Sequence, residues 1–129
     1  MASQHKILVV EDEEVLLGVL KDRLKNEGFD VITARDGEQG LKMALEHKPD
    51  LILLDILMPK MGGITMLKNL RATPAGKDTH VIILTNVSDS KLVHEALTYG
   101  VRDFLVKSDW VLSDLVTAIR KQIDGKVTL

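Results

Sequence analysis

The stretch LILLDILMPKMGG, residues 51–63, passes from an apolar run to a single acidic residue and then to a loop. Leu51–Leu54 contains no polar residue, which is typical of a strand covered on both faces of a parallel sheet. Asp55 follows the last apolar residue directly. A proline and a glycine pair come next and indicate a loop. The stretch therefore predicts a central strand that carries a carboxylate at its carboxyl end.

Four further apolar runs flank this stretch, namely Ile7–Val10, Val31–Ile32, Val81–Leu84 and Phe104–Val106. The segments between the runs repeat their apolar residues at helical spacing. Strands that alternate with helices predict an α/β fold with a parallel sheet and right-handed crossovers, here five β-α units over Lys6–Val127. The run at Val31–Ile32 is short and has polar neighbours, so we expect it at an edge of the sheet.

Each helical segment carries an apolar stripe that we expect to face the sheet. The stripes are Val15, Leu16, Val19, Leu20 and Leu24; Leu41, Ala44 and Leu45; Ile64, Leu67 and Leu70; Leu92, Val93, Ala96 and Leu97; and Leu112, Leu115, Val116, Ile119 and Ile123. The glycines expected to end helices in the left-handed conformation are Gly28, Gly100 and Gly125. Asp36 with Gln39 predicts a variant of the capping box, and Ser88 predicts another helix start.

The bulk composition indicates a single domain over residues 1–129 with a core of about 6–124. The net charge of −2 and an aromatic content of 3% argue against nucleic-acid binding and base stacking. The absence of cysteine excludes disulfides and thiolate metal sites. Neither a signal peptide nor an apolar run long enough for a membrane span is visible, so we expect a cytoplasmic location.

Polar residues end four of the five predicted strands: Glu11–Asp12, Asp55, Thr85 and Lys107. Each position alone has an ordinary explanation, because polar residues often end strands and acidic residues are favoured before helices. Ligands of open parallel sheets, however, bind at the carboxyl ends of the strands. The conjunction therefore predicts one site that contains three carboxylates, a hydroxyl and an ammonium group.

These groups together suit phosphoryl chemistry. Two carboxylates a few ångström apart repel by about 4 kcal/mol at an effective dielectric of 20, so the cluster must protonate, pair or bind a cation. Mg²⁺ accepts a few carboxylates together with water and phosphate oxygens. A carboxylate beside such an ion can attack phosphorus and form an acyl phosphate, with Lys107 and Thr85 near the phosphoryl oxygens.

The chain resembles a response regulator receiver domain of two-component signalling, of the kind found in chemotaxis regulators, over nearly its whole length. The motifs that carry the resemblance are ILVVEDE at 7–13, LDILMP at 54–59, MGG at 61–63, LT at 84–85 and FLVK at 104–107. The resemblance implies a flavodoxin-like, doubly wound sheet of strand order 2-1-3-4-5 with five helices. It also implies a phosphohistidine on a sensor histidine kinase or a phosphotransfer protein as the phosphoryl donor.

The resemblance further implies a role for each site residue. Asp55 would accept the phosphoryl group, and Thr85 and Lys107 would hold it. Glu11, Asp12, Asp55 and the backbone carbonyl of Leu57 would hold Mg²⁺. Phe104 would be the switch aromatic that follows Thr85. The face made by the fourth helix, fifth strand and fifth helix would then bind a downstream protein or a second copy, without direct contact to nucleic acid or membrane.

Three residues depart from the family pattern: Glu11 replaces an aspartate, Ser108 replaces the proline after Lys107, and Asn86 replaces a smaller residue. The Lys107–Ser108 bond is left open as cis or trans. One alternative is a degenerate receiver that acts as a phosphorylation-independent interaction module. A small phosphatase that uses Asp55 is a second alternative, but no acid or base for it is evident. We therefore expect a self-phosphorylating switch and not a turnover enzyme.

The methionines and histidines have simpler interpretations. Met58, Met61 and Met66 favour loop and core packing over a partner-binding patch. The histidines, His5, His47, His80 and His94, fall in separate elements without metal-ligand spacing and are expected at the surface.

Overall fold

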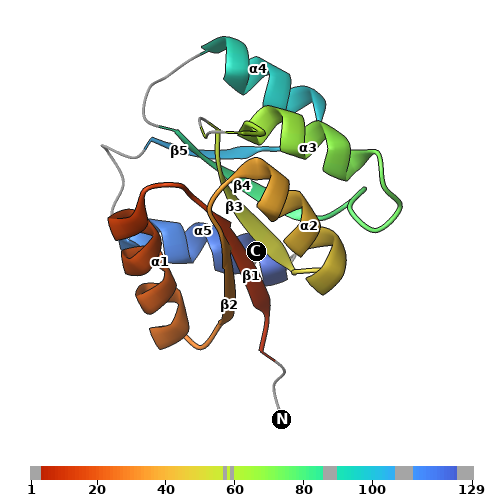
Figure 1. Ribbon diagram of the computed structural model, residues 1–129. Coiled ribbons are helices and arrows are strands. Elements are labelled where there is room, and N and C mark those ends of the chain that lie inside the picture. Colours follow the sequence, from red (N-terminus) through yellow and green to blue (C-terminus); the bar gives the residue numbers. More distant parts are fainter. Residues whose placement is uncertain (1–3, 57, 59, 86–89, 107–111, 125–129) are drawn as a thin grey trace.

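The computed structural model describes residues 4–56, 58, 60–85, 90–106 and 112–124. Within these residues five strands alternate with five helices (Figure 1). The strands are β1 (Lys6–Val10), β2 (Asp30–Ala34), β3 (Leu51–Asp55), β4 (His80–Thr85) and β5 (Asp103–Val106). The helices are α1 (Glu14–Asn26), α2 (Gly37–His47), α3 (Gly63–Arg71), α4 (Ser90–Thr98) and α5 (Leu112–Asp124). The predicted α/β fold is confirmed.

The five strands form one parallel sheet in the order β2-β1-β3-β4-β5, which confirms the order that the resemblance implied. β2 lies at an edge, as its short apolar run predicted. Val10 pairs with Leu54, and Asp55 pairs with Leu84. This register brings the carboxyl ends of β1, β3 and β4 to nearly the same level.

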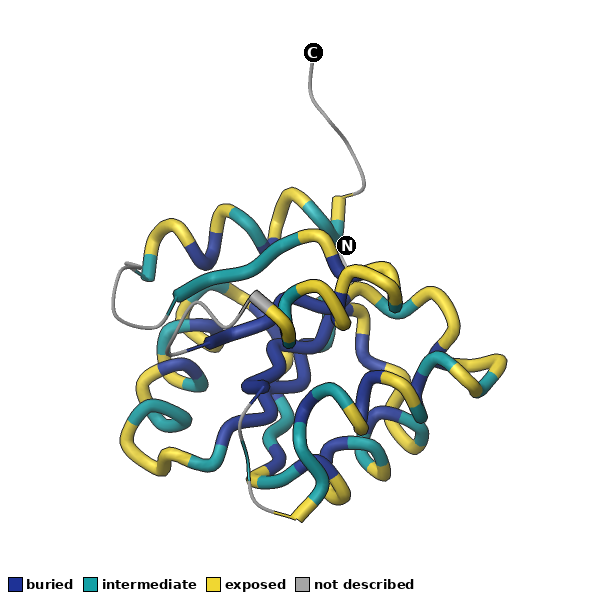
Figure 2. Tube along the Cα trace, turned by 90° about the horizontal axis from the view of Figure 1, so that it is seen from above, coloured by how far each residue is buried: buried dark blue, intermediate teal, exposed yellow. Residues whose placement is uncertain are grey.

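The sheet is covered on both faces, because α2, α3 and α4 lie on one side and α1 and α5 on the other (Figure 1). Successive strand residues alternate between two buried clusters, as the pleat requires. The cluster under α2, α3 and α4 includes Leu8, Val10, Ile52, Leu54, Val81 and Ile83. The cluster under α1 and α5 includes Ile7, Val9, Leu51, Leu53, Ile82 and Leu84. Figure 2 shows this buried centre between helices whose outer turns are exposed.

Two of the predicted helix stripes are too wide. Val15 and Val19 on α1 are 82% and 44% exposed, whereas Leu20 and Leu24 are buried. Leu97 on α4 is likewise 47% exposed beside the buried Ala96. Neighbouring positions on a helix point about 100° apart, so a flat sheet covers one of two consecutive apolar residues and leaves the other outside.

The helix ends follow the predicted chemistry where they are described. Gly28 has φ +97 and Gly100 has φ +84, which confirms left-handed glycines after α1 and α4. Gly125 and Ser88 fall in segments that the structure does not describe.

The cap of α2 is a shifted form of the predicted capping box. Asp36 Oδ1 accepts a hydrogen bond from Gln39 N at 2.8 Å. Gln39 Oε1 accepts one from Arg35 N at 2.8 Å, one residue before the usual donor. Asp36 therefore fixes the start of α2, and its second oxygen remains available for other contacts.

The methionines pack as predicted: Met66 is fully buried, and Met58 and Met61 pack partly buried against the cluster under α2, α3 and α4. His47, His80 and His94 are exposed as predicted, while His5 is only partly so. None of the helices described has the length and apolar character needed to cross a membrane.

Candidate metal and phosphoryl site

The sheet register places three of the predicted site residues next to one another. Glu11 continues β1 by one residue, and its backbone N–H still donates to Ala34 O of β2 at 3.0 Å. Asp55 is the last residue of β3 and pairs with Leu84, so Thr85 stands one residue further along β4. Hydrogen-bonded strands, rather than loops, therefore set the spacing of these side chains.

Three carboxylates converge at this edge of the sheet. Glu11, Asp12 and Asp55 each offer an oxygen atom, and the three oxygens lie within 4.8 Å of one another. Glu11 is 0% exposed and Asp55 is 3% exposed, whereas Asp12 is partly exposed. Glu11 Oε2 also accepts a hydrogen bond from Glu13 N at 3.0 Å. Glu11 and Asp55 thus form the floor of the cluster, and Asp12 forms its solvent side.

The composition of this cluster fits a hard divalent cation. Two carboxylates at such a separation repel by on the order of 3–4 kcal/mol at an effective dielectric of 20. A site built only of carboxylate oxygens, partly open to water, matches the ligands and the coordination habits of Mg²⁺. Among the residues that the structure describes, no second group of three acidic or histidine side chains lies this close together.

The hydroxyl and the aromatic residue of the predicted switch share one face of the sheet. Thr85 is 5% exposed and pairs with Val106, while Phe104 pairs with Ile83. Strand alternation then puts Thr85 and Phe104 on the face that α4 covers. Phe104 packs partly buried against the cluster on that face, and Leu105 packs against the opposite cluster. Phe104 is therefore neither fully buried core nor a free edge residue.

The other predicted site groups lie outside the described residues. They are the Leu57 carbonyl, Asn86, Lys107 and the Lys107–Ser108 bond. The predictions made for them stay predictions.

A cavity of about 560 Å³ opens at the amino ends of the strands, opposite the end of the sheet that carries the carboxylates. Its lining includes Arg71, Tyr99 and the first residues of β4 and β5, His80 and Asp103. Since these residues begin the strands and the carboxylates end them, the cavity is separate from the acidic cluster.

Sequence reasoning missed the residues that hold the loop after Asp55. Lys60 has φ +61, and Met61 lies against Gly37 at the start of α2. The one visible signal was a glycine directly after the cap residue Asp36, which local patterns explain as a helix start.

Comparison with known proteins connects the geometry to a family. The family model described as response regulator receiver domain matches residues 7–120. The chemotaxis protein CheY of Bacillus subtilis is 36% identical over 104 residues, 80% of this chain and 85% of that protein. The transcriptional regulatory protein PhoP for alkaline phosphatase synthesis, also from Bacillus subtilis, is 54% identical over 66 residues. That match spans 51% of this chain but only 28% of PhoP.

Solved structures agree with this match. A structure of the CheX-CheY-BeF3-Mg²⁺ complex from Borrelia burgdorferi is similar with a TM-score of 0.83 and 30% identity. The similarity covers 92% of this chain and 88% of that chain. Receiver domains are signalling switches of two-component systems that bind Mg²⁺ in an acidic pocket. This chain belongs to the response regulator receiver domain family.

Proposed function

We propose that this chain is a receiver in a phosphorelay and that Asp55 accepts the phosphoryl group. One observation carries the proposal: an oxygen of Asp55 lies within 4.8 Å of carboxylate oxygens of Glu11 and Asp12, at the carboxyl end of the central strand. An isolated buried carboxylate would favour its neutral form, but a carboxylate beside a cation stays ionised and can act as a nucleophile.

The proposed reaction is a transfer between two side chains. An Asp55 oxygen attacks the phosphorus of a phosphohistidine, and a new O–P bond forms while the N–P bond breaks. The electron pair of the N–P bond returns to the ring nitrogen, and a proton on the other ring nitrogen lets the imidazole leave neutral. No further acid or base is required, so positioning and charge neutralisation provide most of the catalysis.

The neighbouring residues would serve that transfer in distinct ways. Glu11, Asp12, Asp55 and the Leu57 carbonyl would hold Mg²⁺, which when bound supplies positive charge next to the phosphoryl oxygens. The Thr85 hydroxyl and the Lys107 ammonium would hold two of those oxygens. Thr85 is buried and follows Leu84, the residue that pairs with Asp55, and this position supports its role in holding a phosphoryl oxygen.

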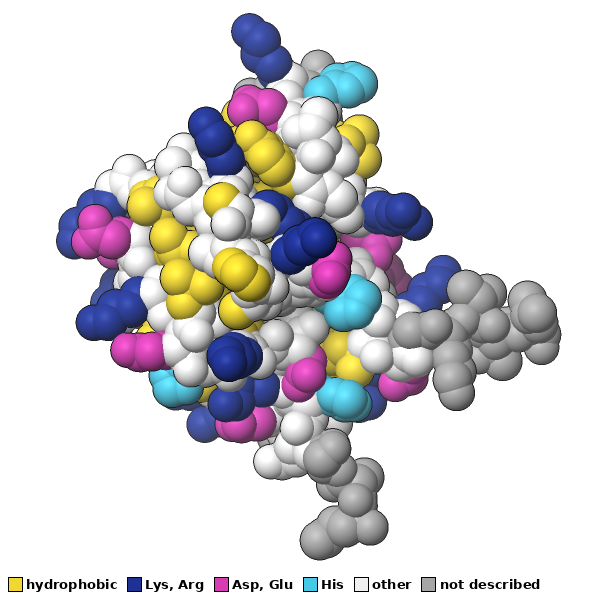
Figure 3. Space-filling model, turned by 90° about the vertical axis from the view of Figure 1, so that its right-hand side faces the viewer, with side chains coloured by type: hydrophobic (Ala, Val, Ile, Leu, Met, Phe, Trp, Pro, Cys, Tyr) yellow, Lys and Arg dark blue, Asp and Glu magenta, His cyan; other side chains and the backbone are white. Residues whose placement is uncertain are grey.

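The proposed output follows from the face that Thr85 and Phe104 share with α4. Movement of Thr85 toward the phosphoryl group would shift Phe104 and the face made of α4, β5 and α5, as a change in population between existing states. That face would bind a downstream protein or a second copy of the chain. On the face drawn in Figure 3, basic and acidic side chains are interspersed. Together with the net charge of −2, this supports an output without direct nucleic-acid contact.

The donor would be a sensor histidine kinase or a phosphotransfer protein in the cytoplasm. Since the phosphoryl group stays on Asp55 after the transfer, the chain would work as a switch and not as a turnover enzyme. The degenerate receiver remains the rival proposal, because the departures at Ser108 and Asn86 lie next to the site in sequence.

Intact-mass spectrometry after incubation with acetyl phosphate and Mg²⁺ tests the proposal. We expect the wild type to gain the mass of one phosphoryl group and Asp55→Asn to gain none. Asp50→Asn is the matched control, because Asp50 lies before the same strand, at the opposite edge, and contacts Lys6 N at 2.7 Å. Equal labelling of Asp55→Asn would refute the assignment, and a wild type that takes no phosphoryl group would favour the degenerate receiver.

A further inference from the structure

Met61, in the loop after Asp55, is in close contact with Gly37, the first residue of α2. A Cβ atom added to Gly37 would lie 1.9 Å from the Met61 carbonyl oxygen and 2.7 Å from its carbonyl carbon. Both neighbours are backbone atoms, so no rotation of a side chain could relieve the overlap. Only glycine allows α2 and this loop to approach so closely.

Side chains hold the loop at the same place from both sides. Lys60 Nζ lies 3.9 Å from Asp36 Oδ2, the oxygen of Asp36 that does not cap α2. Met61 packs against the cluster under α2, α3 and α4. Its Sδ accepts a hydrogen bond from Asn69 Nδ2 of α3 at 3.9 Å. Lys60 keeps a left-handed φ of +61, a conformation that a residue with a side chain holds only when its surroundings fix it.

The far end of the loop returns to the peptide of Asp55 itself. Gly63 N donates to Ile56 O at 2.8 Å. A Cβ atom added to Gly63 would lie 2.4 Å from the Asp55 carbonyl oxygen. A continuous series of backbone contacts thus runs from Gly37 through Met61 and Gly63 to Asp55.

We propose that the N-terminus of α2, residues Asp36 and Gly37, is a seat that positions residues 60–63, where the loop after Asp55 enters α3. The seat sets the affinity of the carboxylate cluster for a divalent cation. The inference rests on the proposed function, because it takes Asp55 as a cation ligand. Gly37 is not one of the converging carboxylates and lies against Met61, so it is a positioning residue that acts through Met61.

Gly37→Ala tests the seat, with isothermal titration of Mg²⁺ alone as the readout. The added methyl group must push Met61 away, and through Gly63 the displacement would shift the peptide of Asp55 relative to Glu11 and Asp12. Substitutions that disturb the support of metal ligands typically weaken metal binding 10–100-fold, so we expect a dissociation constant for Mg²⁺ at least roughly tenfold higher.

Gly40→Ala is the matched control, one helical turn further along α2. Its Cβ atom would meet the Met66 Sδ at 2.9 Å and the Val10 methyl groups at 3.0 Å, in the core and away from the loop. We expect Gly40→Ala to lower the melting temperature and to keep the wild-type Mg²⁺ affinity. Gly18→Ala, whose Cβ atom meets nothing within 4 Å, is the neutral control.

Met61→Ala provides a second test that does not depend on the folding of Gly37→Ala. It removes the side chain that holds the loop between α2 and α3, so we expect weaker Mg²⁺ binding by a chain that is still folded. Wild-type affinity in folded Gly37→Ala or in Met61→Ala, or an equal loss of affinity in Gly40→Ala, would overturn the seat. A wild type that binds no Mg²⁺ would overturn the proposed function as well, which distinguishes the two failures.

Discussion

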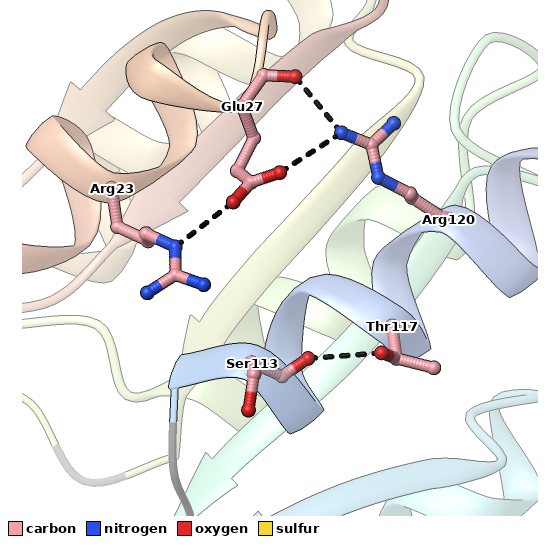
Figure 4. Close-up of polar contacts among 5 residues, drawn as sticks. All are labelled: Arg23, Glu27, Ser113, Thr117 and Arg120. Atoms are coloured by element: carbon pink, nitrogen blue, oxygen red, sulfur yellow. Dashed lines mark hydrogen bonds and ion pairs between the residues drawn. The ribbon is translucent and has the colours of Figure 1, made fainter.

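Arg120 on α5 contacts Glu27 at the end of α1 twice through one nitrogen (Figure 4). Its Nη2 donates to the Glu27 backbone oxygen at 2.9 Å and to Oε1 at 3.2 Å. Arg23 Nε donates to the other carboxylate oxygen at 3.1 Å, and Arg120 Cζ lies 4.9 Å from the centre of the Phe29 ring. A carboxylate at a helix C-terminus opposes the helix dipole, so these two cations stabilise a charge that is otherwise unfavourable.

Glu27 should therefore make the stability of the chain depend on acid pH. Hydrogen bonds from Arg120 first and Arg23 second lower the pKa of Glu27 from its usual 4.5. A lowered pKa means that the charged form contributes stability above about pH 4.5, and that this contribution is lost as the pH falls through the lowered pKa. We expect Glu27→Gln to be less stable than the wild type at neutral pH, by a small amount because water reaches the pair, and the difference to vanish in acid.

Urea denaturation at neutral and acid pH measures that difference. Glu95→Gln is the control, since Glu95 is an exposed carboxylate of α4. A gap between wild type and Glu27→Gln that stays constant down to strong acid would contradict the role of the charge.

The Asp12 carboxylate should destabilise the folded chain when no metal is bound and should strengthen the binding of Mg²⁺. Asp12→Asn removes one of three converging charges, so we expect the metal-free chain to unfold with a free energy about 1 kcal/mol higher. Mg²⁺ should raise the melting temperature of the wild type and have much less effect on the variant. Thermal denaturation in EDTA and in Mg²⁺ measures both, with Asp22→Asn on the exposed side of α1 as the control. A destabilised metal-free variant would show that the carboxylates do not repel.

Thr85 should affect phosphorylation without affecting metal binding. Removal of one hydrogen-bond donor to a developing anion costs roughly tenfold or more in rate. We therefore expect Thr85→Ala to slow labelling by acetyl phosphate by at least that factor while its Mg²⁺ affinity stays at the wild-type value. Thr85→Ser keeps the hydroxyl and should label nearly as fast as the wild type. Equal rates for Ala and Ser would remove the hydroxyl from the proposed mechanism.

Arg71, which lines the cavity at the amino ends of β4 and β5, should stabilise the fold. Its Nε donates to Tyr99 O and its Nη1 to Gly76 O, each at 2.8 Å. Burial lowers the pKa of Arg71, and nearby Asp78 opposes that shift. We expect Arg71→Met to lose about 2 kcal/mol of unfolding free energy, because two carbonyls lose a charged donor.

Arg71→Lys should also destabilise the fold, since one ammonium group cannot reproduce the two-pronged geometry of the guanidinium. Arg102→Met, an exposed substitution on the same cavity, is the control. Chemical denaturation of the three variants gives the comparison, and equal losses for Arg71→Met and Arg102→Met would contradict the bridging role.

Asp55 and Thr85 were predictable from the sequence because each follows an unbroken apolar run, and a run of that kind shows where a buried strand ends. Val15 and Val19 were predicted wrongly because hydrophobicity alone does not say which 100° of a helix surface the sheet covers. The contact between Gly37 and Met61 could not be predicted, because a glycine directly after the cap residue Asp36 is explained equally well by a helix start. The contact joins the first residue of α2 to the loop before α3, and it becomes visible only when α2 and α3 are placed on the same side of the sheet.

The side chains of a pleated strand change sides at every residue, so insertions and deletions affect the acidic cluster differently in strands and in connections. An insertion or deletion in the connection between α3 and β4 would leave Asp55 and Thr85 where they are. The loss of one residue from within Leu51–Leu54 would turn the Asp55 carboxylate to the other side of the sheet and drive a charge toward the packed interior. The connection between α3 and β4 can therefore change its length, but the strand that carries Asp55 can change its length only in steps of two residues.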